Sequence, residues 1–459
     1  MLYKTDKFNL YRKMKFNAIL ILFFLIACSS GGDSPDEMVI NPPTETPKLT
    51  DEELLTTIQK QTFGYFWEGA EVNSGAARER FYLDDPNLDS HLVATGATGF
   101  GFMVIITGIE RGFISRNEGV IRIEKILSFL ENADRFHGVW PHWLDGTTGK
   151  TIPFSAFDDG GDLVETAFLA QGLLSVRQYL INGNNAEKLL ADKADTLWKQ
   201  IEWSWYLNGG NTLIWHWSPN FDWRINLPIK GYNEALIVYV LAASSSTFPI
   251  PPEAYHMGWA DNGNIKTESI SFGQRITLKH NGNLGSVGPL FWAHYSYLGL
   301  NPRNLVDNYA NYWEQNVAHA RVHFNYAVAN PKGFFGYGAD TWGLTASLSM
   351  TGYEAHNINN DLGVIAPTAA LSSYPYLPLE SLRMMRHLYE DLKPSVWGKF
   401  GFYDAFSQQN NWFPQRYIGI DQGPIVIMIE NGRTGLLWNL FMGSPEIQIG
   451  LQKLNFSFQ

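Results

Sequence analysis

Asp158-Asp159-Gly160-Gly161-Asp162-Leu163-Val164-Glu165 is an acidic, glycine-rich break that opens directly into an apolar run over residues 166–179. The same layout recurs three more times along the chain. A carboxylate precedes an apolar run in each case: Glu234 before residues 235–243, Asp361 before 362–371, and Asp421 before 425–440. If these runs form parallel neighbouring helices, their starts converge and the carboxylates line one cavity.

Apolar and amphipathic segments alternate along the chain after residue 50. The apolar segments cover residues 96–111, 163–179, 234–244, 287–297, 363–372 and 424–441, and the amphipathic ones cover 51–67, 117–133, 186–205, 302–320 and 379–392. A helix that is apolar on every side is buried, whereas a helix with one apolar stripe faces water. The alternation therefore predicts an all-α fold, an (α/α)6 toroid in which an outer ring of helices encloses an inner ring. A two-domain α+β arrangement is the main alternative.

The inner helices of such a toroid run parallel, so their N-termini share one face. Each N-terminus has unpaired N–H groups and a partial positive charge, which suits carboxylates and polar ligands. The loops that lead into the predicted inner helices are long and rich in Trp, Tyr, His, Asp and Asn, whereas the opposite connections are short. This asymmetry predicts a ligand cavity on the face of the long loops.

Composition excludes several classes of protein. The chain has 459 residues, of which 45% are hydrophobic and 17% charged, as in an ordinary globular protein. A net charge of −11 argues against nucleic acid as a partner, because proteins that bind nucleic acid carry basic patches. The 16 tryptophans are enough to supply a core and still leave several for a ligand surface.

The N-terminal segment has the pattern of a bacterial lipoprotein leader. Basic residues 13–15 precede an apolar stretch over 18–27, which is too short to span a membrane, and Leu25-Ile26-Ala27-Cys28 resembles a lipoprotein cleavage box. Cys28 is the single cysteine, so a disulfide is excluded. We predict a signal peptide over residues 1–28 that ends at a lipidated Cys28, a flexible tether over 29–48, and one domain over 49–459. The protein would then be lipid-anchored in the cell envelope at the outer membrane, on its periplasmic side or at the cell surface. An ordinary signal peptide with an incidental cysteine is the alternative.

The recurring carboxylates are of the kind that glycoside hydrolysis requires. One carboxylic acid protonates the leaving oxygen, and a second carboxylate activates water or attacks the sugar carbon. Asp162 and Glu165 stand three residues apart and so share one helix face, although an N-cap with its capping-box partner would give the same spacing. Asp158 and Asp159 in the preceding loop are candidates for binding sugar hydroxyls or a cation.

Glu234 and Asp421 are the best candidates for the acid and the base. Burial beside Tyr232 would raise the pKa of Glu234, which suits an acid, although the helix N-terminus acts in the opposite direction. Asp421 precedes Pro424, which we place at the first helical position, and the helix dipole favours its ionised form. A simple N-cap role remains the alternative for Asp421. Glu430, two turns into the same helix, is predicted to be structural.

Aromatic residues near polar groups provide stacking surfaces for pyranose rings. The predicted substrate-binding residues are Asp158, Asp159, Trp140, His142, Trp143, Trp215, Trp217, Trp223, Arg224, Tyr337, Trp342 and Trp412, with Lys230 and Arg416 as further candidates for hydroxyl contacts. Each aromatic residue alone is more often a core residue. Their concentration in the loops of one face is what favours a sugar site.

Other chemistries fit the sequence poorly. His319 and His323 have the spacing of helical metal ligands, but they lie on a predicted outer helix without the glutamate of a zinc protease. No strand is predicted before the glycines at 99–101, so they do not indicate a dinucleotide site. The sequence also has no Gly-x-Ser-x-Gly elbow. We therefore expect no metal and no cofactor.

Five motifs together resemble the glycoamylase-like bacterial proteins of glycoside hydrolase family 144, whose characterised members act on β-1,2-glucans. The motifs are residues 63–67 (FGYFW), 94–101 (ATGATGFG), 159–166 (DGGDLVET), 231–234 (GYNE) and 419–424 (GIDQGP). The resemblance covers roughly residues 50–457. It implies an (α/α)6 catalytic domain that cleaves β-1,2-glucan internally or releases sophorose from an end, with inversion at the anomeric carbon.

The resemblance also implies that catalysis depends on Asp162, Glu165, Glu234 and Asp421. We expect Glu234 to be the general acid and Asp421 the general base, with Asp162 and Glu165 positioning substrate or water. Inversion implies carboxyl groups roughly 6.5–9.5 Å apart. The expected partner is a glucan or gluco-oligosaccharide, the membrane is contacted only through the lipid anchor, and the protein is expected to be a monomer. The alternatives are a non-catalytic glycan-binding lipoprotein, a glucoamylase-like hydrolase of another glucan linkage, and a polysaccharide lyase.

Overall fold

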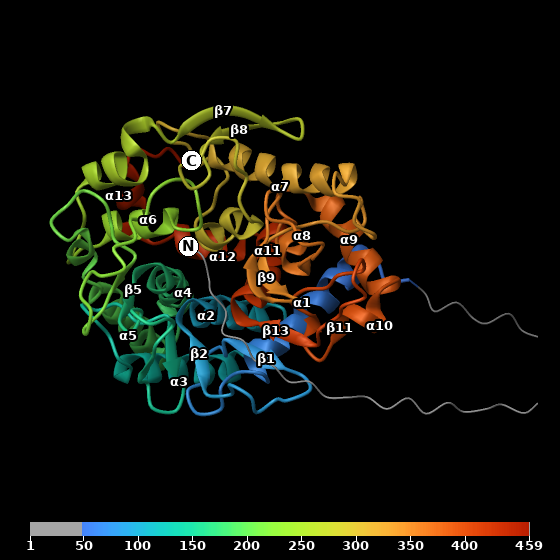
Figure 1. The fold of residues 1–459 in the computed structure, drawn as a ribbon. Coiled ribbons are helices and arrows are strands. Elements are labelled where there is room, and N and C mark those ends of the chain that lie inside the picture. The colour runs from blue at the N-terminus through green and yellow to red at the C-terminus, as the bar shows by residue number, and fades with distance from the viewer. Residues whose placement is uncertain (1–47, 459) are drawn as a thin grey trace, which may run out of the picture. The chain divides into compact units, whose positions relative to one another are not determined.

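Helices predominate in the computed structural model, which describes residues 48–458 (Figure 1). Residues 1–47 and 459 lie outside the described part, and so do the predicted signal peptide, Cys28 and nearly all of the predicted tether. The described chain from Asp51 onward forms a single unit. Within it, no helix has both the length and the apolar content that crossing a membrane requires.

Four helices are buried along nearly their whole length. They are α2 (Thr95–Glu110), α4 (Leu163–Leu180), α6 (Leu236–Ser244) and α11 (Gly419–Arg433). α2 packs against α4 and α11, and α4 also packs against α6, so these helices form one continuous inner layer. The short α8 (Pro367–Leu371) extends the layer by packing on α11.

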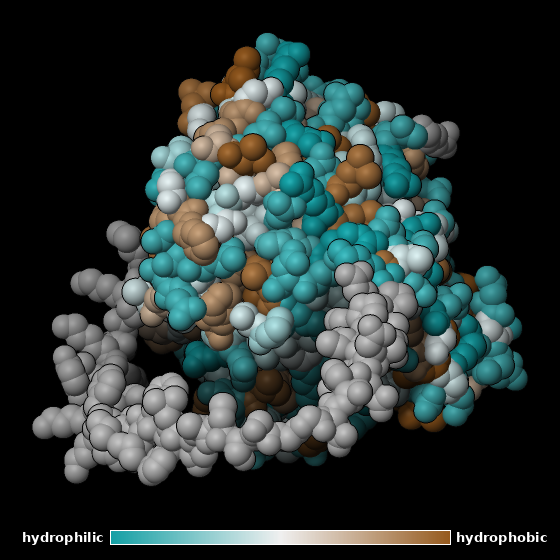
Figure 2. Space-filling model, turned by 90° about the vertical axis from the view of Figure 1, so that its right-hand side faces the viewer, coloured by the Kyte–Doolittle hydropathy of each residue, from teal (hydrophilic) through white to brown (hydrophobic). Residues whose placement is uncertain are grey.

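A second set of helices covers the inner layer and is buried on one side only. Its members are α1 (Asp51–Trp67), α3 (Arg116–Asn132), α5 (Asn185–Lys199), α7 (Tyr312–Ala329), α9 (Pro378–Glu390) and α13 (Pro445–Lys453). α1 packs on α11, α3 on α2, α5 on α4, α9 on α8 and α13 on α6. The side of the unit that carries α9 and α10 (Lys393–Val396) is largely hydrophilic with scattered apolar residues, as expected for outer helices (Figure 2).

Glycine allows α2 and α4 to approach each other closely. A Cβ atom at Gly99 would lie 2.4 Å from Cα of Leu169, and one at Gly172 would lie 2.3 Å from the carbonyl oxygen of Gly99. Neither position can hold a larger residue without separating the two helices. Gly99 and Gly172 therefore serve the packing of α2 against α4.

Short antiparallel strands hold the loops. The sheets of the described chain pair β1 (Arg80–Tyr82) with β13 (Arg416–Ile418), β2 (Leu92–Ala94) with β3 (Trp143–Asp145) and β3 with β4 (Thr151–Ile152), β5 (Gly161–Asp162) with β6 (His216–Trp217), β7 (Lys266–Ser271) with β8 (Gln274–Leu278), β9 (Ala346–Ser349) with β10 (Gly352–Ala355), and β11 (Trp397–Gly398) with β12 (Gly401–Phe402). β2, β5 and β13 end where α2, α4 and α11 begin. Three inner helix starts are therefore fixed by sheet pairing to other loops.

The helical prediction is confirmed in its general form, and several boundaries were wrong. The segment 287–297 does not form an α-helix but two short 3-10 turns, η4 (Leu290–Ala293) and η5 (Tyr295–Tyr297). The other short segments are η1 (Trp203–Leu207), η2 (Ala254–Trp259), η3 (Asp261–Gly263) and α12 (Leu436–Met442). The outer helix predicted over 302–320 begins only at Tyr312, because Asn311 caps it through hydrogen bonds to two backbone amides.

The last inner helix also differs from its prediction. It begins at Gly419 rather than at Pro424, so Pro424 lies inside α11 and not at its first position. The predicted continuous helix over 424–441 is broken at Gly435, whose φ of +73° is a left-handed conformation. Asp361, which was expected at a helix start, lies in a loop six residues before α8 begins at Pro367.

Candidate active site

The starts of the inner helices meet, as the recurring carboxylates predicted. The backbone amide of Gly96 in the first turn of α2 donates a 2.7 Å hydrogen bond to Oε2 of Glu165 in the first turn of α4. Oγ1 of Thr368 in α8 donates a 2.7 Å bond to the backbone carbonyl of Asp421 in α11. Neighbouring inner helices therefore begin side by side, and their N-termini share one face.

Asp162 is held as the N-cap of α4 and binds a histidine. Its Oδ1 accepts hydrogen bonds from the amides of Val164 and Glu165, and its Oδ2 lies 3.0 Å from Nδ1 of His142. Burial alone lowers the pKa of His142, but the charge of Glu165 and the bond to Asp162 raise it to about 10. His142 is therefore an imidazolium at neutral pH, and the N-cap interpretation of Asp162 is correct without excluding a role in the site.

Glu165 and Glu234 are carboxyl groups whose pKa lies near neutrality. Burial raises the pKa of Glu165 to about 7, against the lowering effect of the His142 charge, while Asp162 raises it further. Glu234 lies directly before α6 and is half-buried. The pKa of Glu234 is also raised to about 7, mainly by burial. The hydrogen bond from its own backbone amide lowers this pKa, whereas the charges of Asp162 and Glu165 raise it further. Burial thus outweighs the opposing effects that the sequence left unresolved, and at neutral pH a large share of Glu234 is protonated.

Asp421 makes a pair with Asp404, a residue that the sequence analysis missed. Both side chains are almost fully buried, and the two carboxyl groups lie within hydrogen-bonding contact. Oδ1 of Asp421 accepts a 3.0 Å bond from the hydroxyl of Tyr295, and Oδ2 of Asp404 accepts a 2.8 Å bond from the amide of Leu348. The remaining oxygens, Oδ2 of Asp421 and Oδ1 of Asp404, are buried and receive no hydrogen from any other described group.

One shared proton accounts for both of these oxygens. Burial and the neighbouring Asp404 hold the pKa of Asp421 well above its ordinary value, whereas the pKa of Asp404 is raised by burial to about 6. Two adjacent buried carboxylates cannot both ionise readily, so the pair favours holding one proton between its two carboxyl groups. The expectation that the helix dipole keeps Asp421 ionised was wrong, since burial and its neighbour outweigh the dipole.

Glu79 connects the two groups of acids. It is buried in the loop before β1, and its charge contributes to raising the pKa of His142, of Glu165 and of both members of the Asp404–Asp421 pair. Its carboxylate is paired with Arg80 at 3.2 Å. Neither Glu79 nor Asp404 stands at a helix start, so the pattern that found the other acids could not find them. The available signal was a carboxylate inside an apolar stretch, Phe402-Tyr403-Asp404-Ala405-Phe406.

The predicted loop acids Asp158 and Asp159 lie beside the site and are held by their neighbours. Asp158 is 2.9 Å from Nε2 of His216, which faces Asp162 across the β5–β6 pairing. Asp159 accepts hydrogen bonds from Ser218 and from Nδ2 of Asn220. Burial raises the pKa of Asp159, but these bonds lower it overall. Both acids shape the loop, and a direct contact with sugar remains a prediction.

Half-buried aromatic rings line the loops around Asp162. They are Trp143, Trp215, Trp217 and Trp223, and Trp412 lies in another loop in a similar state. The rings of Trp217 and Trp223 pack against Trp205, at centroid distances of 6.4 and 6.3 Å. Phe154, which the sequence analysis did not select, stacks on His142 at 4.0 Å. These rings form an aromatic surface next to the acids.

The predictions that Trp140 and Trp342 bind substrate were wrong, because both side chains belong to the core. Trp140 has no exposed surface, and its Nε1 donates to the carbonyl of Leu130 in α3. Trp342 is also fully buried and lies edge-on to Phe324 of α7. Tyr337 is half-buried and donates its hydroxyl to Asp361.

Asp361 was expected to share the cavity and does not. Its oxygens accept bonds from the hydroxyls of Tyr326 and Tyr337 and from the amide of Gly363, so it organises a loop. Three basic residues proposed to bind sugar hydroxyls are exposed: Arg224, whose guanidinium lies 4.0 Å from the Phe157 ring centre, Lys230 and Arg416.

The histidines with metal-ligand spacing are structural. His319 and His323 both place Nε2 within 2.9 Å of the carbonyl of Gly288, and burial lowers the pKa of each. Glu430 is structural as well, as predicted, because it is paired with Arg111 at 2.6 Å. Within residues 48–458, no group of three or more His, Cys, Asp or Glu side chains could hold a metal ion.

Comparisons with known proteins identify relatives over most of the chain. The Glycoamylase family model matches residues 226–445. An endo-β-1,2-glucanase from Chitinophaga pinensis, solved with sophorotriose and glucose, is 56% identical and has a TM-score of 0.88; the match covers 90% of this chain and 99% of that one. An endo-β-1,2-glucanase from Talaromyces funiculosus with sophorose is 12% identical with a TM-score of 0.64, over 87% of this chain and 92% of that one, and so shares the fold alone.

A curated relative is longer than this chain. The chain is 45% identical, over 440 residues, to an exo β-1,2-glucooligosaccharide sophorohydrolase (non-reducing end) from Parabacteroides distasonis. That match covers 92% of this chain but spans only 60% of the length of the relative. The two bacterial relatives therefore differ in where they cleave, one within a glucan and one at its end.

Proposed function

Because this chain belongs to the glycoamylase-like proteins of glycoside hydrolase family 144, we propose that it hydrolyses β-1,2-glucan or β-1,2-linked gluco-oligosaccharides. One observation in particular supports the proposal. The carboxyl groups of Glu165, Glu234 and the Asp404–Asp421 pair meet at the inner helix starts, and all have a raised pKa. Acid–base catalysis requires one group that is protonated near neutral pH, to act as the acid, and a second group that is ionised, to act as the base.

The fold that carries these groups is proposed to be an (α/α)6 toroid. Its six inner elements would be α2, α4, α6, the η4–η5 turns, α8 and α11. α3, α5, α7, α9 and α13 would belong to the outer ring, with α1 closing it against α11. The two irregular inner elements contain residues that bind Asp421: Tyr295 lies in η5 and Thr368 in α8.

The proposed reaction inverts the anomeric carbon. Glu234 donates its carboxyl proton to the glycosidic oxygen as the bond from that oxygen to the anomeric carbon breaks. A water molecule attacks the anomeric carbon from the opposite side, and its proton passes to the Asp404–Asp421 pair, which then holds two protons. The base is thus the pair rather than Asp421 alone, and Tyr295 stabilises its charge through the 3.0 Å hydrogen bond.

Asp162, Glu165 and His142 would position the substrate near the acid. Because His142 is an imidazolium, it offers a charged hydrogen-bond donor, while Asp162 fixes the orientation of its ring. The half-buried rings of Trp143, Trp217 and Trp223 would stack on glucose units. The choice between internal cleavage and release of sophorose from an end depends on the loops that close the cavity.

The cellular setting is proposed from the leader sequence. Basic residues, a short apolar stretch and the Leu25-Ile26-Ala27-Cys28 box support a protein anchored in the cell envelope by a lipid on Cys28. The lipid would be its contact with the membrane, at either side of the outer membrane. The protein would act as a monomer.

Product analysis tests the proposal. The purified protein is incubated with linear β-1,2-glucan and with β-1,3-, β-1,4- and α-1,4-glucans, and the products are separated by size. Cleavage of β-1,2-glucan by the wild type and not by Glu234→Gln supports the proposal. Cleavage of another linkage instead would contradict the substrate, and tight binding without any cleavage would identify a glycan-binding protein.

A further inference from the structure

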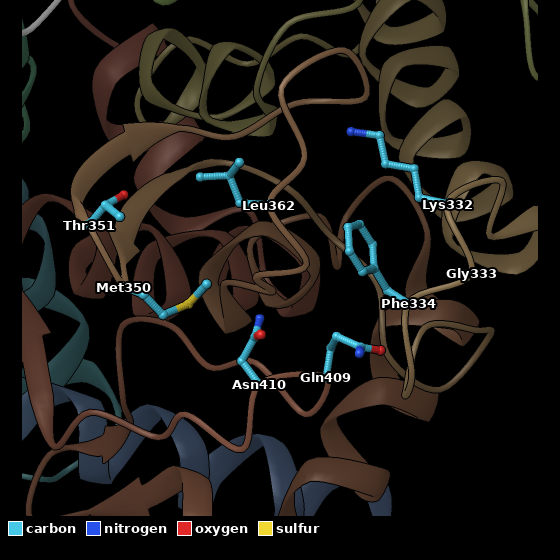
Figure 3. A pocket seen from close by; sticks show the side chains of 8 residues that line it. All are labelled: Lys332, Gly333, Phe334, Met350, Thr351, Leu362, Gln409 and Asn410. Atoms are coloured by element: carbon cyan, nitrogen blue, oxygen red, sulfur yellow. The ribbon is translucent and has the colours of Figure 1, made fainter.

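A cavity of about 560 Å³ opens between four loops near the acid pair. Six of its lining residues, from three loops, are Lys332, Phe334, Met350, Thr351, Gln409 and Asn410. Figure 3 shows these side chains arranged around the open space. Its volume lies within the range of about 300–1,000 Å³ that is usual for small-molecule sites.

The walls of this cavity are fixed by contacts behind them. The amide of Phe335 donates a 2.8 Å bond to Oε1 of Gln409, and Nζ of Lys332 donates to the carbonyl of Asp361 at 2.9 Å. The ring of Phe334 packs against Tyr337 at a centroid distance of 5.4 Å. A cavity whose side chains are held in place pays little entropy when a ligand binds.

Two of the loops that line the cavity lead directly to the Asp404–Asp421 pair. In the β9–β10 hairpin, the amide of Leu348 binds Asp404, and Met350 at the hairpin tip is two residues further along. Two residues span at most about 7 Å of extended chain. Gln409 and Asn410 lie on the segment that begins at Asp404. A polymer bound at the acid pair therefore needs only a short extension to reach the cavity.

The hairpin also carries an aromatic ring close to a residue that binds the acid pair. Tyr353 on β10 lies close enough to Tyr295 to contribute to raising its pKa, and Tyr295 binds Asp421. Its side chain is 46% exposed, and the side chain of Phe335, the neighbour of the lining residue Phe334, is 70% exposed. Exposed aromatic rings beside a cavity are available to stack on sugar rings.

The lining suits a neutral, hydroxyl-rich ligand. Beyond the bonds they already make within the protein, the amides of Gln409 and Asn410, the hydroxyl of Thr351 and the ammonium of Lys332 have further donors and acceptors. The apolar surface comes from Phe334, Met350 and Leu362. No carboxylate is among the residues that line it, so a cationic ligand has no partner there.

We propose that this cavity is a distal subsite that binds glucose units of the same β-1,2-glucan chain that occupies the acid cluster. The proposal rests on the proposed function and adds to it a second, separate contact along the substrate. A glucan long enough to fill both places gains binding energy that a short oligosaccharide cannot use. The enzyme should therefore prefer long chains, and the cavity should set that preference.

The test compares substrates of different length in variants of the cavity. Asn410→Ala and Phe334→Ala remove one polar and one aromatic contact. The matched control is Asn132→Ala, because Asn132 lines another surface cavity of about 360 Å³ near α3. The measurement is the ratio of kcat/KM for long β-1,2-glucan to kcat/KM for sophorotriose.

We expect the ratio to fall about five- to tenfold in both cavity variants, through KM for the long glucan, and to stay within twofold in Asn132→Ala. A ratio that stays at the wild-type value in Asn410→Ala overturns the subsite while wild-type cleavage leaves the proposed function intact. An equal fall of the ratio in the control Asn132→Ala would also overturn the subsite. A wild-type protein that cleaves no β-1,2-glucan overturns both proposals. If Phe334→Ala does not fold, Asn410→Ala, at an exposed position, decides the question.

Discussion

The backbone amide of Gly96 donates a 2.7 Å hydrogen bond to Oε2 of Glu165, and this bond joins the first turns of α2 and α4. The contact exists because residue 96 has no side chain. A Cβ atom there would lie 2.6 Å from the same carboxylate oxygen and 3.0 Å from the ring of Phe168. The position of an acid in the site therefore depends on a glycine in a neighbouring helix.

Gly96→Ala should displace Glu165 and lower kcat/KM by roughly 10- to 100-fold, because a shift of about 1 Å can cost that much. Overpacking should also lower the free energy of unfolding by about 1–3 kcal/mol. Gly210→Ala is the control, since its nearest neighbour atom would be 3.4 Å away at an exposed position. Equal activity of the two variants would contradict the role of this close approach.

Glu234→Gln should remove activity and at the same time stabilise the protein at alkaline pH. The raised pKa of about 7 means that folding favours the protonated form. Stability from this group is fully present below the ordinary pKa of 4.5 and is lost as pH rises through 7. Glutamine avoids that loss, so the variant should be more stable than wild type by about 2–3 kcal/mol at pH 8, and equally stable at pH 4.

Glu430→Gln is the matched control for Glu234→Gln. Glu430 is as buried as the acids of the site, but it is paired with Arg111 at 2.6 Å. Its replacement leaves the half-buried guanidinium of Arg111 without its charged partner and should destabilise the protein by about 1–3 kcal/mol. Chemical denaturation at pH 4 and pH 8 measures both variants. Destabilisation by Glu234→Gln at pH 8 would show that this carboxylate is structural.

Asp404→Asn and Asp421→Asn should have effects that do not add. If the two carboxyl groups share one proton and act as one base, removing either should lower kcat by roughly 10²–10⁴. The double variant should then be no slower than the worse single variant, since the unit is already lost. Single-turnover rates of the three variants measure this. Full activity of Asp404→Asn would show that Asp421 alone acts as the base.

Tyr295→Phe should move the acidic limb of the pH–rate profile to higher pH. The Tyr295 hydroxyl lowers the pKa of Asp421, against the stronger raising effects of burial and Asp404. Without the hydrogen bond the pair holds its protons more firmly, so it gains its single negative charge only at higher pH. Tyr297→Phe at a neighbouring buried position is the control. An acidic limb that stays at the wild-type pH would show that Tyr295 does not affect the pKa of the base.

Much of the inner layer and of the acid site could be predicted from the sequence, because both depend on local signals. An apolar run is recognisable in itself, and a carboxylate near its beginning marks a helix start, as for Asp162 at the N-cap of α4 and Asp421 in the first turn of α11. Asp404 and Glu79 gave no such signal. Their importance arises from distant partners, the amide of Leu348 and the acids on other helices, and local sequence does not encode those approaches.

The aromatic residues show the same limit. Trp140 and Trp143 stand in one short motif, yet Trp140 is in the core and Trp143 is half-buried near the acids. What separates them is the Leu130 carbonyl in α3, which binds the Trp140 indole. Helix boundaries failed for a related reason, since Asn311 rather than the apolar pattern sets the start of α7.

His142→Gln should flatten the alkaline part of the stability curve. Because the Asp162 bond and the Glu165 charge outweigh burial, the pKa of His142 rises from 6.5 to about 10. Stability from its charge is therefore complete below pH 6.5 and is lost as pH rises to about 10, a window above that of the carboxyl groups. Between pH 7.5 and 10 the wild type should lose on the order of 2–4 kcal/mol more than His142→Gln. Denaturant titrations across this range measure the difference, with His91→Gln at an exposed position as the control. Parallel curves for wild type and His142→Gln would mean that His142 is neutral, and the charged donor proposed beside Glu234 would then be absent.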